Sequence, residues 1–212
     1  MSLTFVDFDG TLLDGCSSEK LFFRWLLRRR MMGSRQVLAF SLFPLRWGVC
    51  YGWDVWKKNK AYLCGLSVGA VEKAAALFVD ECLVARLYQP MVKRLCEHAA
   101  AGDVTVLLTG TLDCIAKVVA PRLHIERVCA TACHTEDGRF TARPPRRHPY
   151  GVTKCLLAEH LCGEMGDRLG DCVAYGDSSS DIPLLEAVSR AVAVQPKPGL
   201  RRVAEARGWE VL

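Results

Sequence analysis

Asp7-Phe8-Asp9-Gly10-Thr11-Leu12 follows directly on the apolar run Leu3–Val6, near the start of a chain of 212 residues. A short apolar run that ends in turn-forming residues is typical of a buried strand in a parallel sheet. Side chains at positions i and i+2 leave a strand on the same face, and the turn that follows lets them diverge. We therefore expect a strand that ends in two carboxylates with different roles. The alternative is an ordinary polar turn, which also uses Asp and Gly freely.

Two further apolar runs end in similar residues. Leu107-Leu108 leads into Thr109-Gly110-Thr111, and the run Cys172–Tyr175 leads into Gly176-Asp177-Ser178-Ser179-Ser180-Asp181. Ligands of open α/β sheets bind at the carboxyl ends of the strands. The three motifs are therefore predicted to meet along one edge of one sheet.

After residue 88 the chain alternates between helical and strand patterns. Strands separated by helices imply a parallel sheet with right-handed crossovers, so we predict an α/β fold with a doubly wound parallel sheet. Asp137-Gly138 predicts a hairpin turn, and the basic, proline-rich stretch 143–149 is expected to be an exposed loop. Helices are expected over 90–101, 113–123, 152–161 and 183–188, and strands over 104–108, 127–131, 172–175 and 191–194.

Residues 15–87 show no convincing strand pattern and are predicted to form an all-helical insertion. Ser17 or Ser18 can cap a helix that begins at Glu19. Further helices are expected over 36–43, where Pro44 ends the pattern, over 55–63 and over 68–87. The predicted organisation is an α/β core made of residues 1–14 and 88–212, with a helical unit of residues 15–87 between its two parts.

Composition indicates a globular protein, because half of the residues are apolar and 24% are charged. No positively charged and apolar leader precedes the first strand, so we expect a cytoplasmic protein rather than a secreted one. The eleven cysteines form no CxxC pair, which disfavours a thiolate metal site. Most lie in apolar runs and are expected to be reduced core residues: Cys64, Cys96, Cys114, Cys129, Cys155 and Cys172.

The positive charge is concentrated in residues 19–50, which carry seven bases against one acid, Glu19. Four of the five tryptophans lie in or near this stretch, at positions 25, 47, 53 and 56. One interpretation is a peripheral membrane contact, since the apolar part is too short to span a bilayer. The other is a helical subdomain whose tryptophans pack inward. No nucleic-acid module is recognisable, so nucleic-acid binding is not expected.

The acidic motifs fit phosphate chemistry. One carboxylate of Asp7 and Asp9 can attack phosphorus and form an acyl phosphate, while the other donates a proton to the departing alkoxide and later takes one from water. Asp177 and Asp181 would repel them unless a cation is present, and Mg²⁺ prefers such carboxylate ligands. The alternative for Asp181 is the capping of the helix that follows it.

Two other motifs fit the binding of a phosphate group. The hydroxyl of Thr109 and the unshielded amide of Gly110 are suitable donors to phosphate oxygens, although Thr-Gly is also common in ordinary turns. Lys154 lies at a helix N-terminus, where the helix dipole disfavours a cation, so a compensating anion is expected beside it. The alternative is a surface lysine.

Taken together, in this order, the motifs resemble those of the haloacid dehalogenase superfamily, in the subfamily IB branch that is phosphoserine phosphatase-like. The resemblance extends over the whole chain. It implies that the helical unit is a cap over the site. It further implies a nucleophile and Mg²⁺ ligand at Asp7, a general acid/base and carbonyl ligand at Asp9, phosphoryl binding by Thr109, Gly110 and Lys154, a Mg²⁺ ligand at Asp177, and support of the metal or of Lys154 by Asp181.

The cap departs from the phosphoserine phosphatase pattern. Glu19 stands a few residues later than the expected glutamate, and Lys57, Lys58 and Lys60 stand where an arginine is expected. These differences disfavour phosphoserine as the substrate. The basic, tryptophan-rich composition is similar to that of phosphatidylglycerophosphate phosphatases of the same branch.

The sequence therefore predicts a Mg²⁺-dependent phosphatase that hydrolyses a small or lipid-linked phosphomonoester through an aspartyl phosphate on Asp7. One alternative is a membrane-associated lipid-phosphate phosphatase. Another is a membrane-surface binding protein whose site is vestigial.

Overall fold

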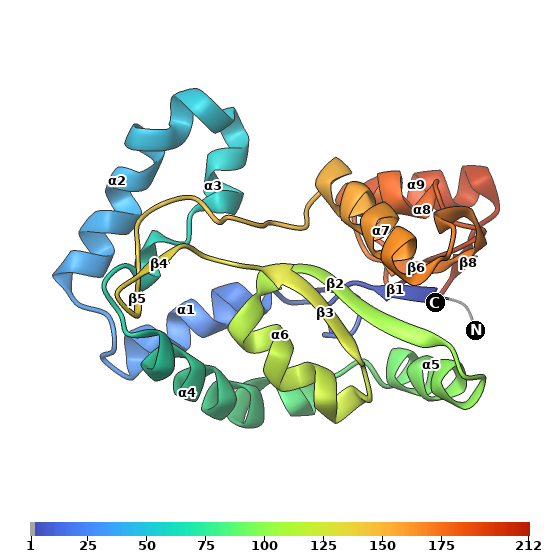
Figure 1. Cartoon of the computed structure of the whole chain (residues 1–212), viewed down its shortest axis with the longest axis horizontal. Coiled ribbons are helices and arrows are strands. Elements are labelled where there is room, and N and C mark those ends of the chain that lie inside the picture. The colour runs from blue at the N-terminus through green and yellow to red at the C-terminus, as the bar shows by residue number, and fades with distance from the viewer. Residues whose placement is uncertain (1–2) are drawn as a thin grey trace.

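A computed structural model describes residues 3–212 of the chain, so Met1 and Ser2 of the predicted core lie outside the described residues. One parallel sheet has the strand order β3-β2-β1-β6-β7-β8, with β1 next to both β2 and β6 (Figure 1). The predicted α/β class with a parallel sheet is confirmed. The strands are β1 (Leu3–Val6), β2 (Val104–Leu112), β3 (Arg127–Thr131), β6 (Val173–Gly176), β7 (Arg190–Ala193) and β8 (Glu210–Val211).

Side chains that alternate along the strands divide the core into two layers. Val6 and Leu107 belong to one buried cluster, whereas Phe5 and Val106 belong to another on the opposite face. Helices α5 (Gln89–Ala100) and α6 (Asp113–Val119) cover the first face. Helices α7 (Val152–Met165), α8 (Ile182–Leu185) and α9 (Pro198–Arg207) cover the second face, as a doubly wound sheet requires.

Every regular element between residues 15 and 87 is helical, as expected, and these helices are not all equally attached to the sheet. Phe22 and Phe78 have ring centroids 5.0 Å apart and belong to the cluster on one face of the sheet. Phe43, Val55 and Ala61 form a small core of their own, under helices that project from the body (Figure 1). The helices are α1 (Ser18–Arg28), α2 (Ser34–Tyr51), α3 (Val55–Lys58) and α4 (Val68–Phe78), with short turns at 52–54, 61–63 and 79–86.

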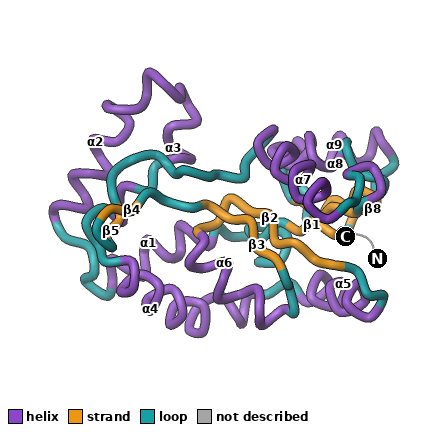
Figure 2. Tube along the Cα trace, viewed as in Figure 1, coloured by secondary structure: helices purple, strands orange, loops and turns teal. Residues whose placement is uncertain are grey.

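The projecting part also contacts a hairpin from the second half of the chain. Loops carry strands β4 (Thr135–Glu136) and β5 (Arg139–Phe140) out from the sheet and back to α7 (Figure 2). The predicted turn at Asp137-Gly138 has φ angles of +49° and +71°. The amide of Gly65 donates to the carbonyl of Phe140 at 2.7 Å, so residues 132–149 support the helical unit. The predicted boundaries of core and helical unit stay a prediction.

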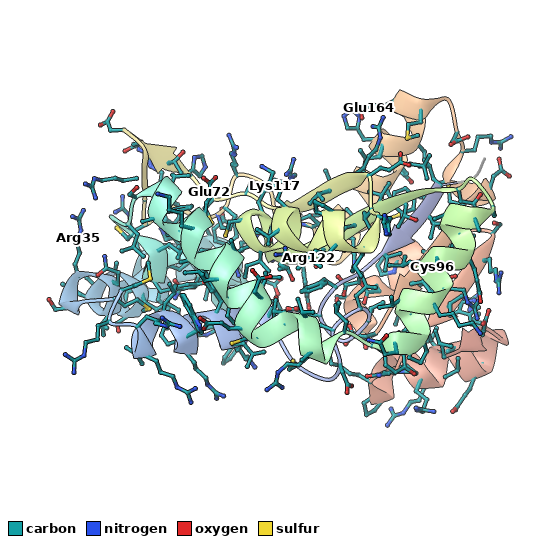
Figure 3. All side chains as sticks on the ribbon, turned by 90° about the horizontal axis from the view of Figure 1, so that it is seen from below. Arg35, Glu72, Cys96, Lys117, Arg122 and Glu164 are labelled. Atoms are coloured by element: carbon teal, nitrogen blue, oxygen red, sulfur yellow. The ribbon has the colours of Figure 1, made fainter. Side chains whose placement is uncertain are left out.

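Helices α4 and α6 lie side by side on the outer face of the molecule (Figure 3). Arg122, just after α6, forms an ion pair with Asp80 at 2.6 Å, beyond the end of α4. This contact joins the helical unit to the α/β part at the surface.

The expectation that Pro44 ends a helix is wrong, because α2 continues to Tyr51. A proline inside a helix leaves the carbonyl four residues earlier without its amide donor. That carbonyl belongs to Phe40, and it accepts a hydrogen bond of 2.9 Å from Nδ2 of the buried Asn59. The side chain of Asn59 replaces the missing donor, and the expected helix over 55–63 is interrupted at Asn59.

Other boundaries also differ from expectation. Strand β2 continues past Leu108 to Leu112. All eleven cysteines are free thiols, but Cys96 is exposed and is not a core residue. His148 and Pro149 are buried, so the stretch 143–149 is only partly an exposed loop. Helix α9 and strand β8 were not predicted. The structure has no helix within residues 3–212 long and apolar enough to cross a bilayer.

The Asn59–Phe40 contact gives a test of how α2 passes Pro44. Asn59→Ala leaves a buried carbonyl unpaired and is expected to lower the free energy of unfolding by about 1–3 kcal/mol. In a Pro44→Ala background the new amide donates to Phe40, so the same substitution is expected to cost about 1 kcal/mol less. Urea denaturation of the four proteins measures this coupling, and strictly additive effects would contradict the assignment.

Candidate active site

A cavity of about 300 Å³ lies at the carboxyl edge of β1, β2 and β6, beside the N-terminus of α7. The motifs that the sequence singled out come from four separate parts of the chain. The structure brings every predicted site residue to the lining of this one cavity: Asp7, Asp9, Thr109, Gly110, Lys154, Asp177 and Asp181.

Lys154 lies at the centre of the ion pairs in this cavity. Its Nζ atom is 2.6 Å from Oδ1 of Asp181 and 3.1 Å from Oδ1 of Asp7, and its side chain is 4% exposed. Burial alone would lower the pKa of Lys154, but Asp181 and Asp7 outweigh it and raise this pKa. The sequence alternative of a surface lysine is therefore wrong, and the anions expected beside Lys154 are present.

The surroundings of Asp7 disfavour the ionised form of its carboxyl group. Burial raises the pKa of Asp7 to about 7 in spite of Lys154, and the charges of Asp181 and Asp177 add to the rise. Burial also raises the pKa of Asp177. The oxygens of Asp7, Asp177 and Asp181 lie within 4.8 Å of one another, a spacing that suits a bound cation.

Asp9 is directed away from Asp7, toward the helical insertion. Its Oδ1 atom accepts a hydrogen bond of 2.9 Å from the backbone amide of Ser18, the first residue of α1. Burial raises the pKa of Asp9, and the hydrogen bonds from Ser18 oppose the rise. The two aspartates of the first motif thus have different partners, as the sequence predicted for the end of a strand.

Glycine is required beside Asp177. Gly10 has φ +84°, and a Cβ atom at this position would lie 2.1 Å from Oδ2 of Asp177. Any side chain here would displace the carboxylate. The turn after the first strand can therefore approach Asp177 only because it carries no side chain.

Asp181 has both of its oxygens engaged. Oδ2 accepts hydrogen bonds from the amides of Asp177 at 3.3 Å and Ser178 at 3.1 Å. Oδ1 accepts from Lys154. Asp181 therefore fixes the loop after β6 and orients Lys154. The sequence alternative, in which Asp181 caps the helix that follows it, is wrong, because its side chain accepts no cap hydrogen bond at the start of α8.

A β-bulge carries Thr109 and Gly110 into the cavity. The pairing of β2 with β3 shifts in register between Leu108 and Leu112, so the strand continues where a turn was expected. Oγ1 of Thr109 accepts from the amide of Thr111 at 3.2 Å. The carbonyl of Gly110 accepts from the hydroxyl of Thr131 at 2.6 Å, which holds this peptide in place.

Sequence reasoning missed Lys197 and His148. Nζ of Lys197 lies 2.5 Å from Oδ2 of Asp177, a few residues beyond the end of β7. The rule that chemistry gathers at the ends of parallel strands also applies to β7 and would have indicated Lys197. His148 lies in the stretch expected to be an exposed loop, and composition gave no sign that it is buried.

His148 is held as a neutral imidazole. The hydroxyl of Thr131 donates its one proton to Gly110, so Nδ1 of His148 must be the donor in its 2.9 Å contact with that hydroxyl. Nε2 is then an acceptor, and it has no partner among residues 3–212. Burial lowers the pKa of His148 to about 3, and the charges of Lys60, Lys58 and Lys57 add to the effect.

Glu19 reaches the same cavity from α1. Its carboxylate accepts from Nζ of Lys60 at 2.5 Å and from the hydroxyl of Tyr62 at 3.1 Å. Glu19 and Lys60, which both depart from the phosphoserine phosphatase pattern, therefore form an ion pair with each other.

His148 gives a pH-dependent prediction for stability. A histidine whose pKa is lower in the folded state contributes stability that is full above its unfolded pKa, near 6.5, and is lost as pH falls toward about 3. The difference in unfolding free energy between the wild type and His148→Asn is expected to fall by about 3 kcal/mol from pH 7 to pH 4. Urea denaturation across this range measures it, and parallel pH curves would contradict the neutral assignment.

Comparisons with known proteins identify the family of the chain. The family model described as haloacid dehalogenase-like hydrolase matches residues 4–186. A Mycobacterium tuberculosis protein named phosphoserine phosphatase SerB1 is 32% identical over 98% of this chain and 69% of its own length. A histidinol-phosphatase of Neisseria meningitidis is 28% identical over 100% of this chain and 98% of its own length.

Solved structures show the same fold. A protein of unknown function from Bordetella pertussis Tohama I has a TM-score of 0.84 and 28% identity, over 99% of this chain and 97% of that one. A phospho-aspartyl intermediate analogue of phosphoserine phosphatase has a TM-score of 0.63 and 19% identity, over 99% and 91%. The prediction of a phosphatase-type hydrolase is confirmed, and the chain belongs to the phosphoserine phosphatase-like haloacid dehalogenase hydrolases.

Proposed function

We propose that the protein is a Mg²⁺-dependent phosphomonoesterase that works through an aspartyl phosphate on Asp7. The single observation that supports this most strongly is the convergence of Asp7, Asp9, Lys154 and Asp177 on one cavity. A membrane-binding protein with a vestigial site is disfavoured, because all the residues that we propose for the chemistry line one cavity.

The proposed reaction has two steps. An oxygen of Asp7 attacks phosphorus while the bond from phosphorus to the ester oxygen breaks, and Asp9 gives its proton to the departing alkoxide. Asp9 then takes a proton from a water molecule that attacks the aspartyl phosphate. This second step frees Asp7 and releases inorganic phosphate.

The positions of the two aspartates support this division of work. Lys154 contacts Asp7 and would favour its ionised form as the nucleophile. Asp9 has a raised pKa because of burial, which suits a proton donor. The hydroxyl of Thr109, the amide of Gly110 and the ammonium of Lys154 would bind the phosphoryl oxygens.

The donor set fits Mg²⁺. On the α/β side of the cavity, the lining contains four buried or half-buried aspartates and two lysines, Lys154 and Lys197. We propose that Asp7 and Asp177, with the backbone carbonyl of Asp9, hold the ion, and that Asp181 positions Lys154. The bound ion would supply positive charge that relieves the repulsion between carboxylates and draws the phosphate to Asp7.

We further propose that the helical unit acts as a cap that excludes water from the site. Helices α1 and α4 share the hydrophobic cluster of the sheet, and Phe40 of α2 packs against it, whereas Phe43 of α2 and Val55 of α3 belong to a separate small core. The part free to move is therefore residues 43–58 rather than the whole segment 15–87.

Asp7→Asn is expected to lower hydrolysis of p-nitrophenyl phosphate by at least about a thousand-fold, because the amide is not a nucleophile. Asp9→Asn is expected to leave a phosphoenzyme that breaks down slowly, detected by rapid quench with radiolabelled substrate. Asp14→Asn, at an exposed aspartate of the same segment, is the matched control and keeps wild-type activity. Full activity in the Asp7 variant would overturn the mechanism.

A second candidate function, hydrolysis of a lipid-linked phosphate at a membrane surface, is favoured by one observation. The projecting part of the helical unit exposes large apolar side chains, with Val49 98% and Trp53 90% exposed, and α2 also exposes Arg35 and Arg46. Apolar side chains interleaved with bases suit an anionic bilayer surface. The exposed apolar residues are Val37, Leu38, Leu42, Leu45, Val49, Trp53 and Trp56.

Co-sedimentation with vesicles tests the lipid candidate. Trp53→Ser is expected to weaken binding to vesicles containing phosphatidylglycerol by about ten-fold. Val211→Ser, at an exposed apolar residue of β8, is the control and changes nothing. Wild-type protein that stays in the supernatant with such vesicles would exclude the lipid candidate and leave a soluble phosphomonoester as the substrate.

A further inference from the structure

A second cavity, of about 510 Å³, adjoins the catalytic one. The two share a boundary formed by Ser17, Glu19, Lys20, Lys57 and Lys60. We call this second cavity the body pocket, because the organic part of a phosphate ester bound at Asp7 would extend toward the helical unit that lines the cavity. Its volume lies within the range of ordinary small-molecule sites.

Aromatic rings form one wall of the body pocket. The ring centroid of Phe23 lies 5.3 Å from that of Tyr62, in an edge contact, and 5.7 Å from that of Phe40, in a tilted contact. These two contacts fix the three rings together. Trp56 also lines the pocket and is 55% exposed, so a face of its indole is open to a ligand. A rigid aromatic wall of this kind favours a flat or apolar group.

The acidic and polar groups of the body pocket are already engaged. Glu19 is neutralised by Lys60 and also accepts from Tyr62. Asn59 donates to the carbonyl of Phe40 and accepts from the amide of Ala61 at 3.2 Å. The pocket therefore offers no unpaired carboxylate to a substrate ammonium group.

Positive charge remains in surplus. Lys20 and Arg24 line the pocket, and within residues 3–212 neither side chain forms an ion pair. Lys57 forms an ion pair with the exposed Asp54, in which Nζ lies 3.0 Å from Oδ1. Unpaired bases beside an aromatic wall match a ligand that carries negative charge in addition to its phosphate.

We propose that the body pocket binds the leaving group of the substrate, and that this group is aromatic or otherwise flat and apolar and carries a second anionic substituent. The assignment deepens the proposed phosphatase function and rests on it. A small leaving group that bears an ammonium, such as the serine of phosphoserine, would leave the aromatic wall uncovered, and its ammonium would find no unpaired carboxylate in the pocket.

The test compares four phosphomonoesters with a matched pair of tryptophan variants. The substrates are phenyl, 4-carboxyphenyl, 4-(aminomethyl)phenyl and ethyl phosphate. Trp56→Ala is expected to lower kcat/KM for phenyl phosphate by about ten-fold relative to ethyl phosphate, because only the ring contacts the indole. Trp53→Ala, at the 90% exposed indole outside the pocket, is expected to leave that ratio unchanged.

A second pair of variants tests the charge. Arg24→Met is expected to lower the preference for 4-carboxyphenyl over phenyl phosphate by about three-fold, the effect of one exposed base. Arg28→Met, at an exposed arginine of the same helix outside the pocket, is the control. A wild-type preference for the aminomethyl compound, or a Trp56→Ala effect equal on phenyl and ethyl phosphate, would overturn the proposal.

Calorimetry with 4-carboxybenzylphosphonate separates this proposal from the function on which it rests. Wild-type protein is expected to bind it more tightly than ethylphosphonate, and Trp56→Ala is expected to remove the difference. If no ester is hydrolysed while the phosphonate preference holds, the phosphatase mechanism fails and the body pocket stands. Turnover of all four esters without any phosphonate preference would overturn the body pocket alone.

Discussion

The buried contacts of Lys154 with Asp181 and Asp7 hold the candidate site together. A buried charge without a partner is strongly destabilising, so each member of this group depends on the others. Asp181 is fixed in turn by the backbone amides that follow β6. The first strand, the loop after β6 and the start of α7 are thereby joined through one ammonium group. Removing the ammonium group of Lys154 would leave the carboxylates of Asp7 and Asp181 facing each other in a buried site.

The charges on the two sides of the cavity are opposite in sign. The α/β side contributes four aspartates against Lys154 and Lys197, whereas the helical unit contributes Lys20, Lys57 and Lys60 against Glu19 alone. Burial raises the pKa values of Asp7 and Asp177, so the ionised forms of these two carboxylates are disfavoured on the acidic side. Charge that is costly to the protein alone would thus favour the proposed binding of a metal ion and a phosphate group.

Much of the site was predictable because it follows strand ends. Asp7, Asp9, Asp177 and Asp181 each stand just after an apolar run, and the topology of a parallel sheet brings such positions together. What escaped prediction depends on contacts between distant segments. No local pattern shows that Asn59 replaces the donor missing at Pro44, that β2 bulges at Thr109, or that His148 is buried beside Thr131. Helix α9 was missed although its sequence carries signals for it: Leu200 and Ala204 stand four residues apart, Pro198 is at its start and Gly208 ends it.

The central claim is that Asp7 and Asp177 form a cation site, and calorimetric titration with Mg²⁺ tests it without any substrate. The account predicts that the wild type binds one Mg²⁺ ion and that Asp177→Asn abolishes the heat signal, while Asp14→Asn binds as the wild type does. Binding of equal affinity in the wild type and Asp177→Asn, or no binding in the wild type, would contradict it.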